Sequence, residues 1–468
     1  MDVAREVVNA QLALAWRRAP AVSLLDRLLN AVEPTQVLAA VEAARAPSLA
    51  SVYEPGGPHP AALRARFSTE LGLTSAELAF RSLYPGLDVG IYAASHSMGI
   101  PSVAGPAAVI DQLGQLSRSG IRVWDDGVWV EVMDRYRAVC AELVGGSLSR
   151  GDVAWFPNVS EALSAVLECV RGGALVYTEG HFTTGHYVHH AWAARSGGRL
   201  IEVPVDPDGA VATARLLDAV TPDTRVVSIS HALFESGWLQ DLSAIAAGVR
   251  ERAPDALLLV DAYQTAGTVP IDADALGDHV LVTAGGHKQL RSGTGASFLY
   301  APRRVLCSLD PARTGWWNHA DPFAFEKGPV RRALDATRFR TGTPTLTGMA
   351  MLLGELAALA SSTNGVLHDA VGRARRVTAG LVQRGLERAV ERGLDVRGSW
   401  GAEHRAAYLT IRHPRARHVT EALAADGIQI DYRPLTQGSQ AGILRVSGNA
   451  AGFGYEMDAV IDAIALVP

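Results

Sequence analysis

The stretch that decides the fold begins with Leu257-Leu258-Leu259-Val260-Asp261, continues through Gln264 and Gly267, and ends in Ala284-Gly285-Gly286-His287-Lys288. Short apolar runs followed by polar residues and glycines are typical of neighbouring buried strands in a parallel sheet. Ligands bind at the carboxyl ends of the strands in such sheets, so the acid and the lysine are expected to face one crevice. Glycines beside the lysine let the backbone approach a ligand closely.

Similar apolar runs alternate with amphipathic stretches from about Val153 to Tyr300. This alternation predicts an α/β fold in which a mainly parallel sheet is covered by helices. The expected strands are Ala174-Leu175-Val176-Tyr177, Val226-Val227-Ser228-Ile229, Leu257-Leu258-Leu259-Val260, Val280-Leu281-Val282 and Ser297-Phe298-Leu299-Tyr300.

Three regions are expected along the chain. Residues 1–90 form an N-terminal helical arm, with helices over Val22 to Val32 and Val37 to Ala44 on either side of Pro34. Residues 91–345 form the large domain. Residues 346–468 form a linking helix and a smaller C-terminal α+β domain.

Composition excludes several classes of protein. The 468 residues carry a net charge of -5 and no Lys/Arg run longer than a pair, which argues against a nucleic-acid partner. Three cysteines without CxxC or Cys/His spacing predict neither a metal site nor a disulfide framework and favour a reducing compartment. No signal peptide or membrane-spanning window is recognised, so the protein is expected in the cytoplasm, with no membrane partner.

Several blocks, taken in order, resemble one family. Val260-Asp261-Ala262-Tyr263-Gln264-Thr265-Ala266-Gly267 followed by His287-Lys288 is similar to the class V aminotransferase group of fold type I pyridoxal 5'-phosphate (PLP) enzymes, with particular likeness to kynureninases. The likeness runs from about Ser95 to the C-terminus. The other blocks are Ser97-Met98-Gly99, Phe156-Pro157-Asn158-Val159-Ser160, His181-Phe182-Thr183-Thr184, Ser236-Gly237, Gly315-Trp316-Trp317-Asn318-His319, Arg340-Thr341-Gly342-Thr343-Pro344 and Leu444-Arg445-Val446-Ser447.

This resemblance implies a role for each matching residue. Lys288 would bind PLP as a Schiff base, Asp261 would ion-pair with the pyridinium nitrogen, and Gln264 would hydrogen-bond the phenolic oxygen. Arg445 would clamp the substrate α-carboxylate with its planar fork. A helix is expected from Glu161 to Val170, with the cofactor phosphate at its start. The remaining cofactor-binding residues implied are Val159, Ser160, Thr184 and His287 around the phosphate, Phe182 stacked on the ring, and Trp316 and Thr343 reaching over from the second subunit of a homodimer.

Each residue also has a plainer interpretation. Lys288 could be a surface lysine, Asp261 or Ser160 a helix N-cap, Phe182 a core residue and Arg445 a surface ion-pair partner. Four histidines cluster near Phe182, and without acid or cysteine spacing they read as ring-contact or surface residues before metal ligands. They are His181, His186, His189 and His190.

Three positions depart from kynureninases and shape the expected activity. Kynureninases carry His, Asp and Tyr where this chain has Gln264, Gly185 and His287. The resemblance therefore implies a PLP-dependent lyase or hydrolase acting at Cα or Cβ of a substituted L-amino acid, preferably an S-conjugated cysteine in antibiotic metabolism, otherwise a kynurenine-like substrate. Elimination, hydrolysis and decarboxylation stay open as outcomes. The alternatives are a class V aminotransferase or epimerase, favoured by the Asp-x-x-Gln spacing, and a PLP-fold sensor.

Overall fold

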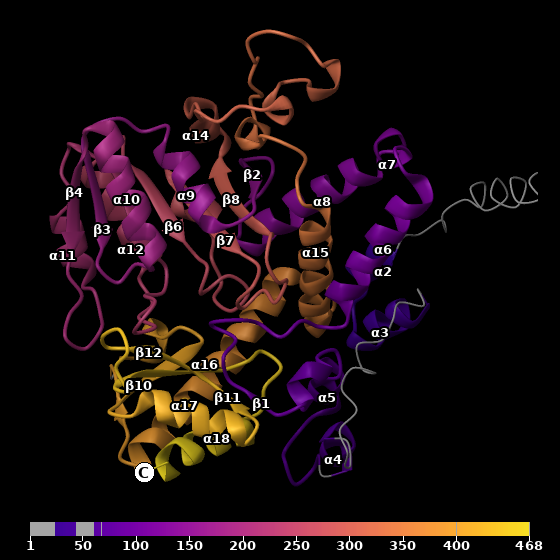
Figure 1. Cartoon of the computed structure of the whole chain (residues 1–468), viewed down its shortest axis with the longest axis vertical. Helices are drawn as coiled ribbons and strands as arrows, with labels where there is room; N and C mark the ends of the chain where they lie inside the picture. Colours follow the sequence, from indigo (N-terminus) through magenta and orange to yellow (C-terminus); the bar gives the residue numbers. More distant parts are fainter. Residues whose placement is uncertain (1–23, 44–59, 67, 399, 468) are drawn as a thin grey trace, which may run out of the picture.

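The computed structural model describes residues 24–43, 60–66, 68–398 and 400–467. In Figure 1 a large domain built on a seven-stranded sheet lies above a smaller C-terminal domain, and the indigo N-terminal helices run alongside both. The predicted α/β class, with a mainly parallel sheet and a separate C-terminal domain, is confirmed.

The large sheet has the strand order β2-β8-β7-β6-β5-β3-β4. Neighbours from β7 through β4 are parallel, whereas β8 runs antiparallel to both β7 and β2. All five predicted strands lie in this sheet, whereas its two edge strands, β2 and β4, were not predicted. The apolar run of β4 is interrupted by exposed charged residues. The strands are β2 (Gly151–Phe156), β3 (Ala174–Thr178), β4 (Arg199–Val203), β5 (Thr224–Ser230), β6 (Leu257–Asp261), β7 (Val280–Gly285) and β8 (Ser297–Pro302).

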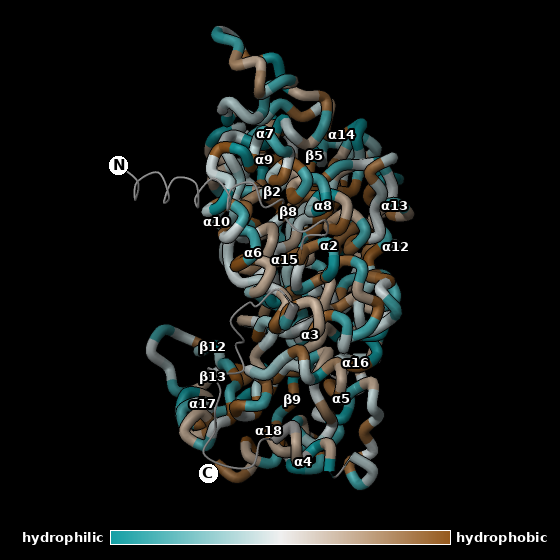
Figure 2. The backbone as a smooth tube through the Cα atoms, turned by 90° about the vertical axis from the view of Figure 1, so that its right-hand side faces the viewer, coloured by the Kyte–Doolittle hydropathy of each residue, from teal (hydrophilic) through white to brown (hydrophobic). Residues whose placement is uncertain are grey.

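Alternate residues of the central strands are buried on opposite faces of the sheet. In β6, Leu258 and Val260 pack into the core formed with α8, α12 and α15, whereas Leu259 packs into the core formed with α9 and α10. Each such buried Leu or Val side chain stabilises the fold by about 1.5–3 kcal/mol. Figure 2 shows brown, apolar segments running through the interior of the large domain. These strands are therefore mainly apolar, without the regular polar alternation of a half-exposed sheet.

The helices of the large domain cover both faces of this sheet. They are α6 (Ala104–Ser119), α7 (Arg122–Asp125), α8 (Val128–Leu143), α9 (Val159–Leu167), α10 (Thr183–Ser196), α11 (Thr213–Asp218), α12 (Leu242–Arg252), α13 (Ala273–Leu276), α14 (Arg303–Ser308) and α15 (Leu346–Ala360).

Helix α15 with the turn after it, Leu346–Thr363, is long and apolar enough to cross a membrane by length and composition. The segment contains the charged residue Glu355, so it is not the uncharged apolar window that the sequence prediction required of a span. About 72% of the window is buried inside the structure, as in the core helix of a globular domain.

One acid, Glu355, lies in this apolar helix. Glu355 accepts hydrogen bonds from the Ser102 backbone N–H (2.9 Å) and hydroxyl (3.0 Å), just before α6 begins. Burial raises the pKa of Glu355 to about 8, because desolvation disfavours the carboxylate more strongly than these hydrogen bonds favour it. The residue therefore joins α15 to the start of α6.

The small domain is a four-stranded antiparallel sheet packed against helices. Its strand order is β12-β13-β10-β9, and residues 91–92 pair with this domain through a separate two-stranded sheet, β1-β11. The strands are β1 (Ile91–Tyr92), β9 (Asp395–Val396), β10 (Tyr408–His413), β11 (Ile428–Gln429), β12 (Asp431–Pro434) and β13 (Gly442–Ser447). The helices are α16 (Leu367–Glu391), α17 (Ala416–Ala425) and α18 (Gly454–Leu466).

The N-terminal arm contributes four described helices, α2 (Leu24–Leu29), α3 (Pro34–Ala43), α4 (Pro60–Arg66) and α5 (Ser75–Arg81). Val22 and Ala44, at the ends of the two predicted helices, lie outside the described residues. Pro34 begins α3, the position where its fixed φ and missing N–H are tolerated best. Arg81 of α5 pairs with Glu456 of α18 (2.7 Å), which fastens the arm to the small domain.

The connection between the two domains passes over the turn that carries Lys288. Ser447 donates its backbone N–H to Ala93 (2.8 Å), and six residues later Gly99 donates its own to the carbonyl oxygen of His287 (2.7 Å). A Cβ atom on Gly99 would overlap the carbonyl oxygen of Lys288 and the side chain of Arg291. Only glycine allows this close approach.

We expect Gly99→Ala to destabilise the protein by about 1–3 kcal/mol, because the added methyl group meets backbone that cannot move aside. The exposed helical position Gly380 has no atom within 4 Å of an added Cβ, so Gly380→Ala is the matched control. It should stabilise by about 0.5–1 kcal/mol. Urea unfolding of both variants measures the difference, and equal effects would contradict the tight approach at Gly99.

Candidate active site

Two strand ends bring the predicted acid and lysine to one edge of the sheet. Strands β6 and β7 are parallel neighbours, with Asp261 paired to Thr283 at their carboxyl ends. Lys288 follows β7 by three residues, and its Nζ lies 4.7 Å from the ring centre of Tyr263 and 5.5 Å from that of Phe182. Lys288 is therefore no surface lysine, contrary to the plainer interpretation.

The environment of Lys288 favours its neutral amine. Burial lowers the pKa of Lys288 to about 8, with Asp261 opposing the shift and Arg445 and Arg433 adding to it. A lysine with this pKa is a better nucleophile and proton acceptor near neutral pH than an exposed one.

Asp261 and Gln264 present polar atoms that the protein itself does not fully use. Asp261 accepts a hydrogen bond from the backbone N–H of Tyr263 (2.9 Å), and desolvation raises its pKa while Lys288 works against that rise. Gln264 is 6% exposed, yet neither its Oε1 nor its Nε2 has a hydrogen-bond partner. Buried amides nearly always have partners, so this pair of atoms fits a ligand that supplies both a donor and an acceptor.

Two helices begin beside each other at the predicted phosphate position. Helix α9 starts at Val159, two residues earlier than its expected start at Glu161, because the Asn158 side chain caps it by accepting the Glu161 N–H (3.0 Å). Ser160 is therefore not the N-cap. Its hydroxyl donates to Thr184 Oγ1 (3.4 Å) in the first turn of α10. Free backbone N–H groups and the helix dipole at such a position favour an anion.

The aromatic residue expected over the cofactor ring lies between Lys288 and the small domain. Phe182 is 40% exposed and meets Phe234 edge-on, with ring centres 4.9 Å apart. Arg445 packs against Phe234, with its guanidinium carbon 4.7 Å from the Phe234 ring centre. Phe182 is thus exposed at the site and is not a core residue.

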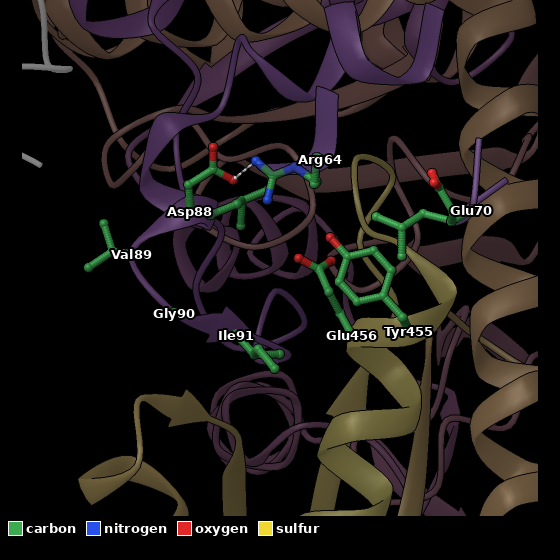
Figure 3. Close-up of a pocket in the computed structure, with 10 residues that line it drawn as sticks. Arg64, Glu70, Asp88, Val89, Gly90, Ile91, Tyr455 and Glu456 are labelled. Atoms are coloured by element: carbon green, nitrogen blue, oxygen red, sulfur yellow. Dashed lines mark ion pairs between the residues drawn. The ribbon is translucent and has the colours of Figure 1, made fainter. Parts of the chain in front are cut away.

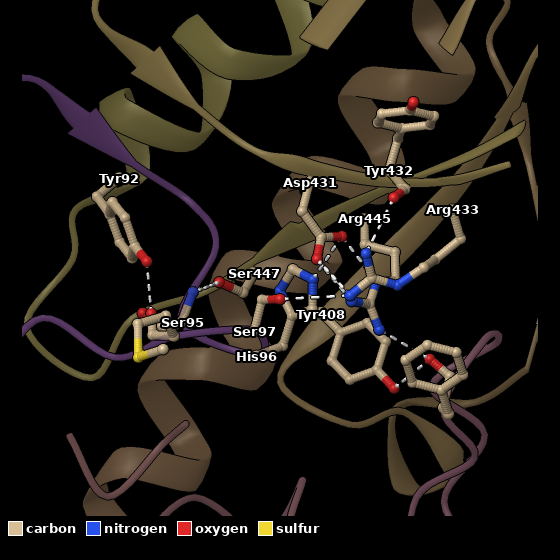
Figure 4. Close-up of polar contacts among 12 residues, drawn as sticks. Tyr92, Ser95, His96, Ser97, Tyr408, Asp431, Tyr432, Arg433, Arg445 and Ser447 are labelled. Atoms are coloured by element: carbon tan, nitrogen blue, oxygen red, sulfur yellow. Dashed lines mark hydrogen bonds and ion pairs between the residues drawn. The ribbon is translucent and has the colours of Figure 1, made fainter. Parts of the chain in front are cut away.

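Arg445, on β13, is 1% exposed and is held by an acid that the sequence did not single out. Its Nε and Nη2 donate to the two carboxylate oxygens of Asp431 (2.8 and 2.6 Å), directly across the strand pair. Figure 4 shows Asp431 between Arg445 and His96. The side edge of the guanidinium fork is therefore occupied within the protein, and Nη1 donates to the carbonyl oxygen of Phe234 (3.1 Å).

His287 and the two residues expected to act from a second subunit have other partners. The Nδ1 of His287 is 2.6 Å from the Tyr263 hydroxyl, and burial lowers its pKa. Trp316 is 38% exposed and lies in the segment that connects β8 to α15. It packs against Trp317 and Phe325 of the same segment and against Trp124 of α7. Thr343 is exposed at the end of that segment. Nothing within the chain pairs Trp316 with Lys288 among the described contacts.

The four histidines beside Phe182 divide into buried and exposed members. His181 and His189 are buried and hydrogen-bond to Ser228 (3.4 and 2.9 Å), and desolvation lowers the pKa of both, that of His181 to about 3. His189 is buried and so is not a surface residue, but it makes ring contacts, with its ring centre 4.8 Å from that of Tyr177 and 5.3 Å from that of His181. Within the part of the chain that the structure describes, no group of three or more His, Cys, Asp or Glu residues could hold a metal ion.

Sequence reasoning missed the residues that surround Lys288 and Arg445 from other elements. Asp431 and Arg433 lie two residues apart on one face of β12, the strand that pairs with the Arg445 strand. This spacing of two charged residues on the preceding strand was the sequence signal that could have identified them. His96, Phe234 and Tyr408 gave none, because each comes close only through the tertiary fold. His96 stacks on Tyr408, with ring centres 4.8 Å apart.

A separate cavity of about 640 Å³ lies between the N-terminal arm and α18 (Figure 3). Two of its lining residues, Arg64 and Asp88, form an ion pair, and the adjacent Arg81 pairs with Asp88 and Glu456. These ion pairs join the arm to the small domain.

Comparisons with known proteins agree with this geometry. The family profile described as Aminotransferase class-V matches residues 127–430. The chain is 27% identical over 340 residues to the Uncharacterized aminotransferase YcbU of Bacillus subtilis (strain 168), covering 72% of this chain and 85% of that one. It is 26% identical over 363 residues to a kynureninase of Burkholderia pseudomallei (strain 1106a), covering 73% and 82%.

Solved structures share the fold at lower identity. A mutant of C-DES with glycine covalently linked to its PLP cofactor superimposes with a TM-score of 0.72 at 20% identity, covering 82% of this chain and 99% of that one. The cysteine desulfurase CsdA of Escherichia coli superimposes with a TM-score of 0.70 at 18% identity, covering 83% and 97%. The fold type I architecture that the sequence predicts is confirmed.

The low pKa of Lys288 can be measured because the chain has only one other lysine, the exposed Lys327. We expect the reactivity of Lys288 toward acetic anhydride, in protein freed of any cofactor, to rise about tenfold per pH unit and to level off near pH 8, since only the neutral amine reacts. Mass spectrometry of both lysine peptides gives the two rates, with Lys327 as internal reference. Lys288 labelling that keeps rising in proportion to Lys327 labelling up to pH 10 would contradict the shift.

Proposed function

The chain belongs to the class-V aminotransferase family, and from this premise we propose that it is a kynureninase-like lyase or hydrolase acting at Cα or Cβ of a substituted L-amino acid. It is a PLP-dependent enzyme. Our preferred substrate is a cysteine conjugated through sulfur, with a kynurenine-like amino acid as the other choice. One neighbour by fold is named a cystine C–S lyase and one relative a kynureninase. These two names correspond to the two proposed substrate classes.

The observation that carries the proposal is the trio at the ends of β6 and β7. A buried lysine of lowered pKa, an acid on the neighbouring strand and an amide without a partner lie together. These donors and acceptors fit PLP. Lys288 would attach it covalently, Asp261 would pair with the ring nitrogen and Gln264 would hydrogen-bond the ring oxygen.

The helix starts and aromatic residues would complete the cofactor site. Val159, Ser160 and Thr184 offer backbone N–H groups and hydroxyls at the starts of α9 and α10, where a phosphate is favoured. Phe182 would cover the ring. The Nδ1 of His287 contacts Tyr263, so its Nε2 is the atom left to donate to the phosphate.

When bound, PLP withdraws electrons from the α-carbon of the substrate and so makes its bonds easier to break. The chain's residues choose which bond. Arg445 would hold the α-carboxylate and thereby fix the orientation of the α-carbon. Lys288 would accept the α-proton, because its lowered pKa leaves a useful fraction of neutral amine near pH 7.

One observation favours a second candidate, a class V aminotransferase or amino-acid epimerase. Gln264 follows Asp261 by three residues, a spacing that resembles those enzymes, and its amide points to the same ligand. Formation of a keto acid, or of the D-amino acid, would distinguish this function from cleavage at Cβ.

We further propose a homodimer that works in the cytoplasm in specialised, antibiotic metabolism. The exposed aromatic cluster of Trp316, Phe323 and Phe325 is an apolar surface of the kind that protein interfaces cover. Cys140, Cys169 and Cys307 are free, which suits a reducing compartment.

A substrate screen tests the proposed function. The cofactor-loaded protein is incubated with S-alkyl and S-aryl cysteine conjugates, L-kynurenine and ordinary L-amino acids, and the products are identified by mass spectrometry. We expect release of a thiol from a cysteine conjugate, reduced by about 10²–10⁴-fold or more in Lys288→Ala. Borohydride reduction should place the cofactor on the Lys288 peptide with Lys327 unlabelled. Cofactor on Lys327, or keto acids as the main products, would refute the lyase proposal.

Subunit mixing tests the proposed role of Trp316. Lys288→Ala and Trp316→Ala proteins should each have little activity, whereas an exchanged equal mixture should regain about a quarter of wild-type activity. The reason is that half of its dimers are hybrids, each with one intact site. Analytical ultracentrifugation should show a dimer. No recovery despite verified exchange would mean that Trp316 acts in its own subunit, or not at all.

A further inference from the structure

Strand β12 presents a second charged pair alongside Arg445. Asp431 lies directly opposite Arg445 across the β12–β13 pair, and Arg433, two residues on, shares its face. The Asp431 carboxylate contacts both guanidinium groups, with Oδ2 2.6 Å from Arg445 Nη2 and 3.0 Å from Arg433 Nη2. Figure 4 shows both arginines converging on this one acid.

The contacts of Arg445 leave part of it for a ligand. A guanidinium has five N–H donors, and three of them are used, two on Asp431 and one on the Phe234 carbonyl. The two that remain are on Nη1 and Nη2, which form the end edge of the group. That edge can bind a carboxylate with both oxygens while Asp431 holds the side edge.

Arg433 reaches the same place from the solvent side. Its guanidinium carbon lies 5.4 Å from the ring centre of Phe234, the ring that Arg445 also covers at 4.7 Å. Unlike Arg445, its side chain is 37% exposed. Its other polar contacts are with the Tyr432 carbonyl (3.1 Å) and the Ser97 hydroxyl (3.4 Å), so its guanidinium is not saturated.

The charges of this cluster do not cancel. Two guanidinium groups face the single carboxylate of Asp431, which leaves a net charge of +1. His96 also contacts Asp431 (3.2 Å), but it adds no charge near neutral pH, because burial and then Arg445 lower its pKa to about 4. Burial works to raise the pKa of Asp431, but hydrogen bonds from His96 and Arg445 hold it well below its usual range, so the carboxylate stays ionised.

We propose that Asp431 is a positioning residue that holds Arg445 and Arg433 as a two-arginine site for the single α-carboxylate of the substrate, with Arg433 as the second residue in contact with it. This inference rests on the proposed amino-acid substrate and deepens it. A cluster of net charge +1 is balanced by one carboxylate. Asp431 fixes the plane of Arg445 and keeps its end edge turned toward the ligand.

The test compares L-alanine with L-alaninamide, which lacks the carboxylate. Both are titrated by isothermal calorimetry into cofactor-loaded wild type, Arg433→Met, Arg433→Lys and Asp431→Asn, and Arg415→Met is the control because Arg415 is an exposed arginine of the same domain. We expect Arg433→Met and Asp431→Asn to weaken L-alanine binding about 10- to 100-fold and to leave L-alaninamide binding within about twofold. Arg433→Lys should recover part of the loss, and Arg415→Met should change neither.

Several outcomes would overturn the inference. Equal weakening of both ligands would mean that Asp431 or Arg433 supports the fold only, and unchanged L-alanine binding in Arg433→Met would remove it from the site. Because Arg433 is partly exposed, its variants should fold even if Asp431→Asn does not, and thermal unfolding checks this. On a turnover substrate the same variants should raise KM with little change in kcat. A wild type that binds neither ligand would refute the amino-acid substrate itself and this inference with it.

Discussion

One hydrogen bond joins the two halves of the candidate site. The N–H of Gly99 donates to the carbonyl oxygen of His287, the residue before Lys288, while the same connection is bonded at Ala93 and Ser95 to Ser447, two residues after Arg445. The turn that carries Lys288 and the strand that carries Arg445 are therefore fixed to one short segment. A substrate that contacts both residues bridges two domains, so their relative position must be set by the backbone. This close approach requires glycine at position 99, because a Cβ atom there would overlap the carbonyl oxygen of Lys288.

The electrostatics of the site follow from the same packing. Three cations, Lys288, Arg433 and Arg445, lie beside the Phe182–Phe234 pair, and Asp261 and Asp431 are the acids that oppose them at Lys288. Burial and the two arginines together push Lys288 toward its neutral form, although both acids resist. Arg445, the arginine proposed to bind the substrate carboxylate, thus also helps to lower the pKa of Lys288. When a substrate carboxylate neutralises that charge, the pKa of Lys288 should rise, which favours uptake of a proton by the lysine at that stage.

The sequence predicted what depends on local pattern. The central strands β3, β5, β6, β7 and β8 are apolar because both faces of the sheet are covered, and their ends could be located from the polar residue or glycine that follows. Asp261 and Lys288 could be paired because parallel neighbours end at one edge. The edge strands β2 and β4 were not predicted, and exposed charged residues interrupt the apolar run of β4. The start of α9 was misplaced because Asn158 caps it. The role of Glu355, which holds the start of α6, also could not be predicted, because Ser102 comes close to it only through the tertiary fold.

The partners of Arg445 could not be predicted, and the reason is physical. Asp431 meets Arg445 through the register of an antiparallel pair, and a shift of one residue would turn Asp431 to the other face. His96 is 335 residues from Asp431 in the sequence, and Phe234 is 211 residues from Arg445. No local spacing therefore encodes these contacts. Loss of Asp431 would also cost more than loss of a surface contact, because a buried guanidinium without its counter-ion is strongly disfavoured. The proposed carboxylate site is thus a property of the folded small domain, in which Asp431 fixes the guanidinium of Arg445 and sets the net charge that a bound carboxylate would balance.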